Sequence, residues 1–229
     1  MSFPVDRAHP PSRLVFDDGA RRLELRPWAM TDVDPLTQAV NESLPELRAF
    51  MPWAHQPITR EFEYALLARF QADYYAGRDL GFGMFGENGE ILGGVGLHPR
   101  VPLNPRGLEV GYWCRSAHAG KGWTTLGVKM VTVLAFDYFE CDRFQVSYDE
   151  ANVASRRLVE KCDFPFEGVV RNLMGAVPAE ARESGYRGTR RHRLHALLPE
   201  DLPRVEWLAE VRAHTMVYDA LGARCEKSG

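Results

Sequence analysis

The chain lacks several features that mark whole classes of protein. Its 28 Lys and Arg nearly balance its 31 Asp and Glu, so no positive charge excess indicates nucleic acid or anionic membrane as a partner. Its longest apolar runs are far too short to span a bilayer. The first residues, MSFPVD, lack the basic and then apolar pattern of a signal peptide. These absences predict a cytoplasmic protein.

Cysteine pairs with metal-binding spacing are also missing. The cysteines are Cys114, Cys141, Cys162 and Cys225, and no CxxC occurs among them. In a cytoplasmic chain of this size such cysteines favour reduced thiols over two disulfides. His192 and His195 stand three apart on a predicted strand and so point to opposite faces, which makes them poor joint metal ligands. We therefore expect no metal site.

What is present is a composition that can build one substantial domain. The chain has 229 residues, 45% of them hydrophobic, and shows no internal repeat. Residues 1–20 are polar and proline-rich and are expected to form a flexible arm or a tail that folds over the domain. Residues 21–198 carry the periodic segments of a domain. Residues 199–229 are expected to form a helical extension, because apolar residues recur there at helical spacing.

The periodic segments alternate between strand and helix patterns. Strands are expected at 22–26, 81–85, 91–98, 108–114, 143–148, 166–172 and 191–198. Helices are expected from residue 31, interrupted at Pro45 and Pro52, and then at 61–76, 122–139, 152–161 and 200–221. This order predicts an α+β protein in which a mixed central sheet is flanked by helices on both faces.

The most informative segment is residues 108–125, LEVGYWCRSAHAGKGWTT. It is typical of a strand, a turn and then a helix that opens with Gly120, Lys121 and Gly122. The first N–H groups of a helix lack intrahelical partners and carry its positive dipole end, so they bind anions such as phosphate. Glycine allows the main chain to approach a pyrophosphate closely. A Gly-x-Gly pair alone is weak evidence, because most such pairs are turns.

The surrounding motifs resemble the GNAT acyltransferase superfamily and, within it, the RimJ/RimL-like N-acetyltransferases. The family strand Glu-Ile-Gly-Tyr-Trp appears here as residues 109–113, and its Gln/Arg-x-x-Gly-x-Gly/Ala loop as residues 117–122. The family's Asn-x-x-Ser appears as residues 152–155, at the start of a helix that ends near Phe164. Residues 40–44 and 50–54 look like the family's first-helix and acceptor-side segment. The resemblance covers roughly residues 22–198.

This resemblance implies a GNAT fold and an acyl-CoA N-acyltransferase domain at 21–198. The implied enzyme uses acetyl-CoA as co-substrate, with no metal, and acetylates a primary amine. Three positions depart from the family pattern. Ala117 replaces the first loop Gln or Arg, Asp163 replaces the Gly before the Phe, and Leu158 stands where many GNAT enzymes carry a proton-donating Tyr.

The resemblance also implies which residues bind the cofactor. Main-chain groups of Trp113 and Cys114 are expected to meet the pantetheine amides, and Asn152 to bind the pantetheine arm or simply cap its helix. The pyrophosphate is expected against Gly120, Lys121, Gly122, Trp123 and Thr124. His118 either contacts phosphate or is an exposed loop residue. Arg156, Arg157 and Lys161 are candidates for the 3′-phosphate side, or form an ordinary solvated face.

Glu109 and Ser155 are the catalytic candidates. The resemblance places Glu109 beside the acetyl group as general base. Apolar neighbours in the strand would partly desolvate this carboxylate and raise its pKa towards values that suit a general base. The alternative is a strand glutamate paired with Arg100 or Arg115. In the RimJ/RimL-like group a serine at the position of Ser155 protonates the leaving thiolate, although a serine there also caps helices.

The acceptor side is the least defined part of the sequence. Glu42, Trp53 and His55 are the candidate acceptor-binding residues, and specificity is expected in segments 42–55, 73–80 and 175–189. Two alternatives remain open, a non-catalytic acyl-CoA-binding or regulatory domain and an enzyme that uses another donor such as succinyl-CoA. The apolar stripe of the C-terminal extension, which includes Trp207, packs either on its own domain or on a second subunit, and we lean towards a homodimer.

Overall fold

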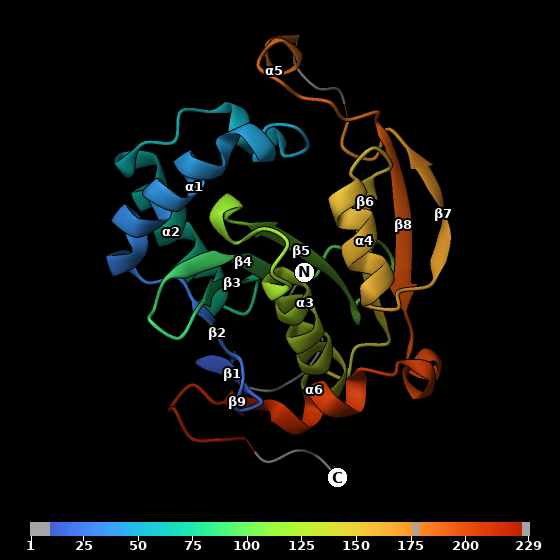
Figure 1. The fold of residues 1–229 in the computed structure, drawn as a ribbon. Coiled ribbons are helices and arrows are strands. Elements are labelled where there is room, and N and C mark those ends of the chain that lie inside the picture. Colours follow the sequence, from blue (N-terminus) through green and yellow to red (C-terminus); the bar gives the residue numbers. More distant parts are fainter. Residues whose placement is uncertain (1–9, 176–178, 226–229) are drawn as a thin grey trace.

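The protein is described here by a computed structural model, which describes residues 10–175 and 179–225. Figure 1 shows one large sheet with helices around it. The strands are β1 (Arg13–Asp17), β2 (Arg22–Pro27), β3 (Leu80–Phe85), β4 (Ile91–His98), β5 (Gly107–Cys114), β6 (Arg143–Asp149), β7 (Phe166–Arg171), β8 (Arg191–Leu197) and β9 (Thr215–Tyr218). The α-helices are α1 (Val33–Leu47), α2 (Arg60–Tyr75), α3 (Trp123–Val133), α4 (Val153–Lys161), α5 (Ala179–Glu183) and α6 (Leu208–His214).

The nine strands of the described residues form a single sheet in the order β7-β8-β6-β5-β4-β3-β2-β1-β9. All neighbouring strands run antiparallel except β5 and β6, which are parallel. A parallel pair needs a crossover connection, and here α3 supplies it. The prediction of a mixed sheet flanked by helices is confirmed.

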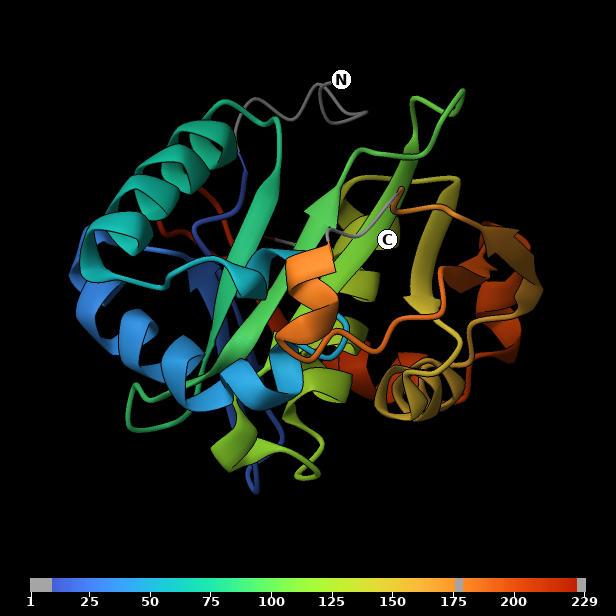
Figure 2. The same cartoon turned by 90° about the horizontal axis from the view of Figure 1, so that it is seen from above.

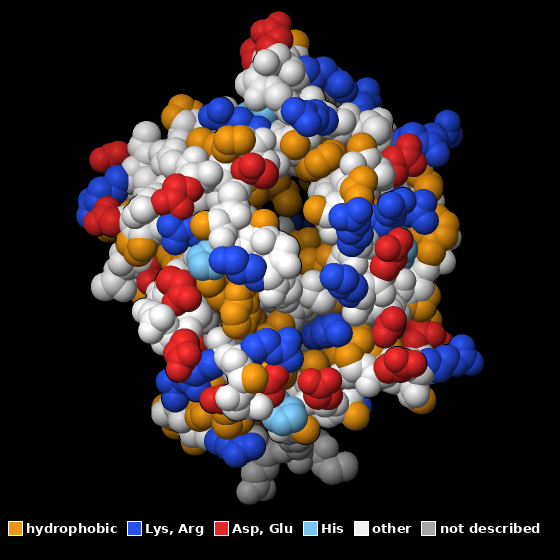
Figure 3. Space-filling view, viewed as in Figure 1, with side chains coloured by type: hydrophobic (Ala, Val, Ile, Leu, Met, Phe, Trp, Pro, Cys, Tyr) orange, Lys and Arg blue, Asp and Glu red, His pale blue; other side chains and the backbone are white. Residues whose placement is uncertain are grey.

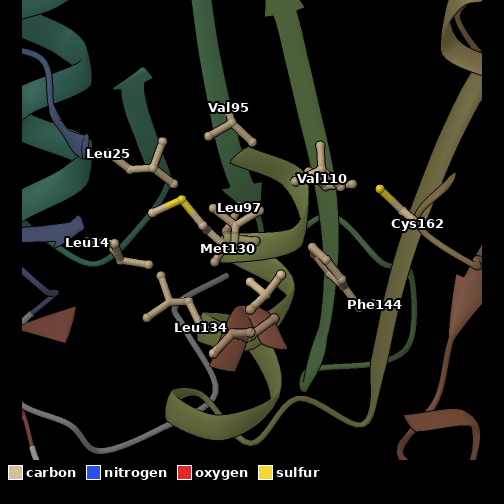
Figure 4. Close-up of a cluster of buried hydrophobic side chains, with 14 of the residues drawn as sticks. Leu14, Leu25, Val95, Leu97, Val110, Met130, Leu134, Phe144 and Cys162 are labelled. Atoms are coloured by element: carbon tan, nitrogen blue, oxygen red, sulfur yellow. The ribbon is translucent and has the colours of Figure 1, made fainter. Parts of the chain in front are cut away.

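Two hydrophobic clusters fix the layers on the two faces of the sheet. The larger cluster joins the strands to α3, α4 and α6. Figure 4 shows part of this cluster, with Met130 next to Leu97 and Leu134 on the side of Leu14. The smaller cluster packs α1 and α2 on the other face, around Phe85 and Ile91. Figure 2 shows α1 and α2 side by side. Because side chains alternate along a strand, each β4 and β5 residue is assigned to one of these faces.

The expected flexible arm is wrong over part of its length. Residues 1–9 of that arm lie outside the described residues, but Arg13–Asp17 form strand β1, paired with β2 and β9. Leu14, Val15 and Phe16 are buried there. Three consecutive buried residues give no period-two alternation, which is why the pattern search missed this strand.

The C-terminal extension is also not the single helix that was expected. It forms a short turn of 3-10 helix (Pro199–Arg204), helix α6 and then strand β9, and the predicted residues 226–229 lie outside the described part. Its apolar stripe is buried within the same chain, since Trp207, Leu208 and Val211 belong to the larger cluster with α3. This stripe therefore no longer argues for a second subunit.

Two smaller expectations resolve differently. Pro45 does not interrupt the first helix, because α1 runs through it to Leu47 and the proline sits in the last turn. The helix expected to reach residue 139 is α-helical to Val133 and continues as a π-helical turn over Leu134–Tyr138.

All four cysteines lie in the described residues, and none is joined in a disulfide. In the ranges 10–175 and 179–225, no helix combines the length and apolarity needed to cross a membrane.

Candidate functional site

The central feature of the site is a V-shaped opening between β5 and β6. The two strands pair only from Gly107 to Glu109 of β5, and beyond this last rung they diverge. Strand β4 pairs with the opposite edge of β5 as far as Cys114. Residues 110–114 therefore keep main-chain donors and acceptors free on the edge that faces the V. Figure 3 shows the surface hollowed next to α4, with apolar side chains lining the hollow.

The N-terminus of α3 opens beside this edge. Gly120 has φ +76° and Gly122 has φ +83°, a left-handed conformation that side chains rarely adopt. No side chain caps α3, and a Cβ built on either glycine meets nothing within 4 Å. The first N–H groups of α3 thus face open space, as the predicted anion site requires.

Side chains of α1 hold the loop that carries this helix start. Arg115 donates through Nε to Glu42 at 2.8 Å. The Ser116 N–H donates to the hydroxyl of Ser43 at 3.0 Å, and the Ser116 hydroxyl donates to Glu46 at 2.7 Å. Hydrogen bonds from Arg115, and then from Gln38, lower the pKa of Glu42. Glu42, predicted to bind the acceptor, thus helps to hold the loop through its bond with Arg115.

The other residues predicted to bind the cofactor surround the same loop. Lys121 is exposed and His118 half-buried. Partial burial and the cations Lys121 and Arg115 lower the pKa of His118, which favours its neutral form. Burial raises the pKa of the Cys114 thiol, with the Thr124 hydroxyl partly opposing it, so Cys114 stays protonated at neutral pH. Trp123 packs against the core beside them.

Helix α4 forms the other side of the V. Its first turn shows which of Asn152 and Ser155 caps the helix with its side chain. The Asn152 side chain accepts a hydrogen bond from the Ser155 N–H at 3.0 Å and is thus the cap of the helix. Ser155 does not cap the helix; its buried side chain lies beside the Tyr112 hydroxyl without a well-aligned hydrogen bond. Burial raises the pKa of Tyr112 well above its usual range. Figure 3 shows that Lys and Arg side chains gather over α4, where Arg156, Arg157 and Lys161 are exposed.

Glu109 lies on the last paired rung, at the foot of the V. Its half-buried carboxylate accepts a hydrogen bond from Nε2 of Gln145 at 2.7 Å. The alternative pairing with Arg100 or Arg115 is wrong, because Arg100 binds Asp79 and Arg115 binds Glu42. The Glu109 carboxylate is therefore held by a neutral donor rather than neutralised by a cation.

Glycines form the floor beside this rung, on the face that carries α1 and α2. Gly81, Gly96 and Gly111 lie in register on β3, β4 and β5. The ring of Trp113 covers Gly94, and the ring of His98 covers Gly96 and Gly111. Sequence reasoning missed His98, which lies in no motif; the alternating glycines of residues 93–96 were the one available signal of an open strand surface.

The far side of the V is organised by Asp149, which sequence reasoning also missed. Its carboxylate accepts hydrogen bonds from the Thr189 and Arg190 N–H groups at 2.7 and 3.1 Å. His192, only 6% exposed, pairs with Asp149 across the strands, and its Nδ1 has no hydrogen-bond partner within the described residues. Burial lowers the pKa of His192, while Asp149 and Glu109 oppose this.

The two strand histidines point to opposite faces, as predicted. His195 lies on the α4 side, where it stacks on Tyr148 and its Nδ1 contacts the Phe164 carbonyl at 2.9 Å. In the part of the chain that the structure describes, no group of three or more His, Cys, Asp or Glu side chains is placed to hold a metal ion.

The α5 segment forms a roof over one end of the V. His55 contacts the Ser184 hydroxyl through Nδ1 at 2.7 Å and the Arg48 carbonyl through Nε2 at 2.9 Å. The Arg187 N–H donates to the Ala49 carbonyl at 2.9 Å. Figure 2 shows α5 beside the segment after α1. His55 and the half-buried Trp53, the predicted acceptor-binding residues, lie in the segment after α1, and both ring nitrogens of His55 already have partners. Residues 176–178 of the predicted segment 175–189 lie outside the described residues.

Comparison with known proteins gives consistent matches. The probable N-acetyltransferase YjcK of Bacillus subtilis is 26% identical over 153 residues, which span 66% of this chain and 84% of that protein. The structure of Mycobacterium smegmatis RimJ in complex with CoA-disulfide superposes with a TM-score of 0.74 at 20% identity, over 90% of this chain and 98% of RimJ. A RimL α-N-protein acetyltransferase in complex with coenzyme A gives a TM-score of 0.68 at 17% identity, over 80% and 97%.

A family model described as acetyltransferase (GNAT) domain matches residues 22–165, more than half of the chain. The matched range contains the free edge of β5, the start of α3 and both catalytic candidates. The chain therefore belongs to the GNAT acetyltransferase family.

Proposed function

We propose that this GNAT acetyltransferase transfers the acetyl group of acetyl-CoA to a primary amine, either a protein N-terminus or a small-molecule amine. The observation that carries the proposal is the adjacency of three features: the free β5 edge, the uncapped start of α3 and the carboxylate of Glu109 at the foot of the V. The RimJ and RimL structures are complexes with CoA, which supports acetyl-CoA as the co-substrate of this chain.

The open main-chain groups fit the two polar parts of acetyl-CoA. The N–H groups around Gly120 and Gly122 suit the pyrophosphate, because no side chain occupies that space. The β5 edge from Val110 to Cys114 suits the pantetheine amides, which need alternating donors and acceptors. This orientation directs the thioester towards the foot of the V.

The residues at the foot of the V suit direct transfer. When bound, acetyl-CoA supplies an electrophilic thioester carbon. Glu109 draws the acceptor amine to this point and orients it, and a general base takes up its proton. A free N–H of β5 stabilises the oxyanion that develops as the C–N bond forms. The C–S bond then breaks, and Ser155 is placed on the α4 side to give a proton to the thiolate.

This placement favours an enzyme over a domain that only binds acyl-CoA. A non-catalytic domain has no need for a carboxylate at the foot of the V. The RimL structure is that of an α-N-protein acetyltransferase, which supports a protein N-terminus as one acceptor class. Because the α5 segment covers one end of the V, we expect the acceptor to enter past Trp53 and His55.

The test is a panel of peptides with free N-termini and of small amines, assayed by release of free thiol from acetyl-CoA. Mass spectrometry of the products identifies the acetylated nitrogen, and succinyl-CoA in parallel tests the donor. Acetylation of at least one amine is expected. CoA binding, seen as a rise in melting temperature, without turnover on any amine would overturn the enzymatic proposal.

A further inference from the structure

His98 stands next to Glu109 and is the last residue of β4. The two residues pair directly across the antiparallel strands, so both side chains project from the same face. The His98 ring turns back along the sheet rather than out to solvent. A Cβ added to Gly111 would come within 2.8 Å of its Nε2, and one added to Gly96 within 2.9 Å. The ring therefore occupies space that two glycines leave free.

This placement brings Nε2 of His98 close to the foot of the V. Gly111 is the second residue after Glu109 and lies just beyond the last rung shared by β5 and β6. Nε2 makes no hydrogen bond among the described residues, and the side chain keeps 20% of its surface exposed. On the same floor, the space above Gly81 is open. An amine that approaches Glu109 along this floor thus passes the unoccupied nitrogen.

Asp79 determines which nitrogen of His98 carries the proton. Its Oδ1 lies 2.7 Å from Nδ1 of His98, and its Oδ2 accepts from Arg100 at 2.9 Å. Burial pulls the pKa of Asp79 upward, but His98 and Arg100 hold it below its ordinary value. An ionised carboxylate only accepts, so Nδ1 must carry the hydrogen. Nε2 is then the bare, basic nitrogen.

We propose that the Asp79–His98 pair is the proton acceptor of this enzyme, a proposal that rests on the acetyltransferase function above. The charged side chains around the ring are Asp79 before β3, Arg100 after β4 and Glu109 on β5. Glu109 attracts the acceptor as an ammonium ion. The ammonium loses one proton to Nε2, which converts the imidazole to an imidazolium held by Asp79.

The freed lone pair of the amine then attacks the thioester carbon. As the C–N bond forms, the electrons of the C–S bond leave with the sulfur, and the nitrogen gives up its second proton to balance the proton that the thiolate takes up, so the products are the amide, the CoA thiol and the imidazolium. Imidazole is the better final acceptor at neutral pH, because it binds a proton more strongly than an ordinary carboxylate does. Glu109 and His98 therefore divide the work, one by attraction and the other by proton uptake.

The test compares H98Q and D79N with R100Q, which removes the other partner of Asp79 but leaves His98 in place. We expect H98Q to lower kcat/KM for the amine about a hundredfold or more at neutral pH. The acidic limb of its pH profile should vanish, and the deficit should shrink at high pH, where the free amine is abundant. D79N should lose about tenfold or more, because its amide leaves the tautomer unspecified. R100Q should stay within about threefold of wild type, and CoA affinity should be unchanged in all three.

Nitrogen-15 NMR of the wild-type protein provides a readout that needs no turnover. With the His98 signals assigned by their loss in H98Q, we expect the Nδ1–H tautomer. An Nε2–H tautomer overturns the proposal, and so does an active wild type whose pH profile survives in H98Q. If H98Q does not fold, the D79N profile decides in the same way. Absence of turnover by the wild type on every amine would instead overturn the proposed function itself.

Discussion

The two walls of the V are built on different principles. The wall that we propose for acetyl-CoA, called the cofactor wall, consists of main-chain groups, namely the free edge of β5 and the start of α3, and it comes from the continuous residues 108–125. The wall that we propose for the amine, called the acceptor wall, consists of side chains brought together from separate elements, such as Asp79 with His98 and His55 with Ser184. A main-chain wall can serve one constant ligand, whereas a side-chain wall can be changed residue by residue to suit different acceptors.

The largest effect in this comparison is expected from a substitution that disrupts only the cofactor wall. Replacing Gly122 with valine should weaken CoA binding on the order of a hundredfold, equivalent to losing one or two charge-assisted hydrogen bonds. The branched side chain would fill the space in front of the α3 N–H groups. Isothermal titration with CoA measures the change.

Gly19 offers a matched control for this substitution. It has the same φ of +83° and equally open surroundings, but it lies in the turn between β1 and β2. G19V should carry a similar backbone strain and lower the melting temperature, yet leave CoA affinity unchanged. Equal CoA affinities in G122V and G19V would show that the α3 N-terminus is not the phosphate site.

The next prediction sharpens the contrast from the acceptor side. E109Q should lower kcat/KM for the amine by roughly ten- to a hundredfold, the range for a lost hydrogen bond to a charged group. CoA affinity should hardly change, since the carboxylate faces the acceptor. Steady-state kinetics across pH measure this, with E24Q on β2 as the control. Wild-type rates at every pH would make Glu109 a structural residue.

A third prediction concerns Glu63 of α2, the helix that leads into the acceptor wall. Glu63 is buried, its Oε2 has no hydrogen-bond partner among the described residues, and burial raises its pKa from 4.5 to about 7. The folded state therefore binds this proton more tightly than the unfolded state does. Stability due to Glu63 should be full below about pH 4.5 and should be lost as the pH rises to 7.

Chemical denaturation at pH 5 and pH 8 measures this effect. E63Q should remove the loss and be more stable than wild type at pH 8 by on the order of 2 kcal/mol. E61Q is the control on the same helix, since hydrogen bonds from its own N–H and from Thr59 lower the pKa of that exposed carboxylate. It should not be stabilised at pH 8. An E63Q curve parallel to wild type would mean that Glu63 is charged in a polar site.

The smallest effects separate the two residues at the start of α4. S155A should slow turnover about tenfold by removing a proton donor, yet leave stability nearly unchanged, because Ser155 contributes only its N–H to the cap. N152A should lower the unfolding free energy by about 1 kcal/mol through loss of the cap. Equal rates in S155A and wild type would exclude a chemical role for Ser155.

The fold shows the same contrast between local and long-range features as the two walls do. Elements defined by a local pattern could be predicted from the sequence, and strands defined by distant pairing could not. Elements with clear periodicity, such as β5 and α4, were predicted within one or two residues because their local pattern agrees with their burial. Strand β1 and strand β9 were missed because each is short and lacks alternation, so only pairing in the finished sheet defines them.

The local structure around the candidate site residues was predictable where it depends on neighbouring residues in the sequence. Gly122, Asn152 and Glu109 could be located from motifs because the chemistry needs a turn, a cap and a strand position. The roles of Glu42 and His55 could not, because their partners Arg115 and Ser184 are 73 and 129 residues away. Asp79 and His98 are only 19 residues apart, but one precedes β3 and the other ends β4, so no short motif joins them.

The pairing of β1 with β9 has a consequence for how the molecule is made. Strand β1 leaves the ribosome long before its outer neighbour β9, which lies at residues 215–218. Until β9 has been translated, β1 can pair only with β2, so its outer edge remains exposed. Closure of this edge is therefore a late step, and a ribosome-stalled chain that ends before residue 215 is expected to expose the apolar strand Leu14–Phe16 to chaperones or to other nascent chains.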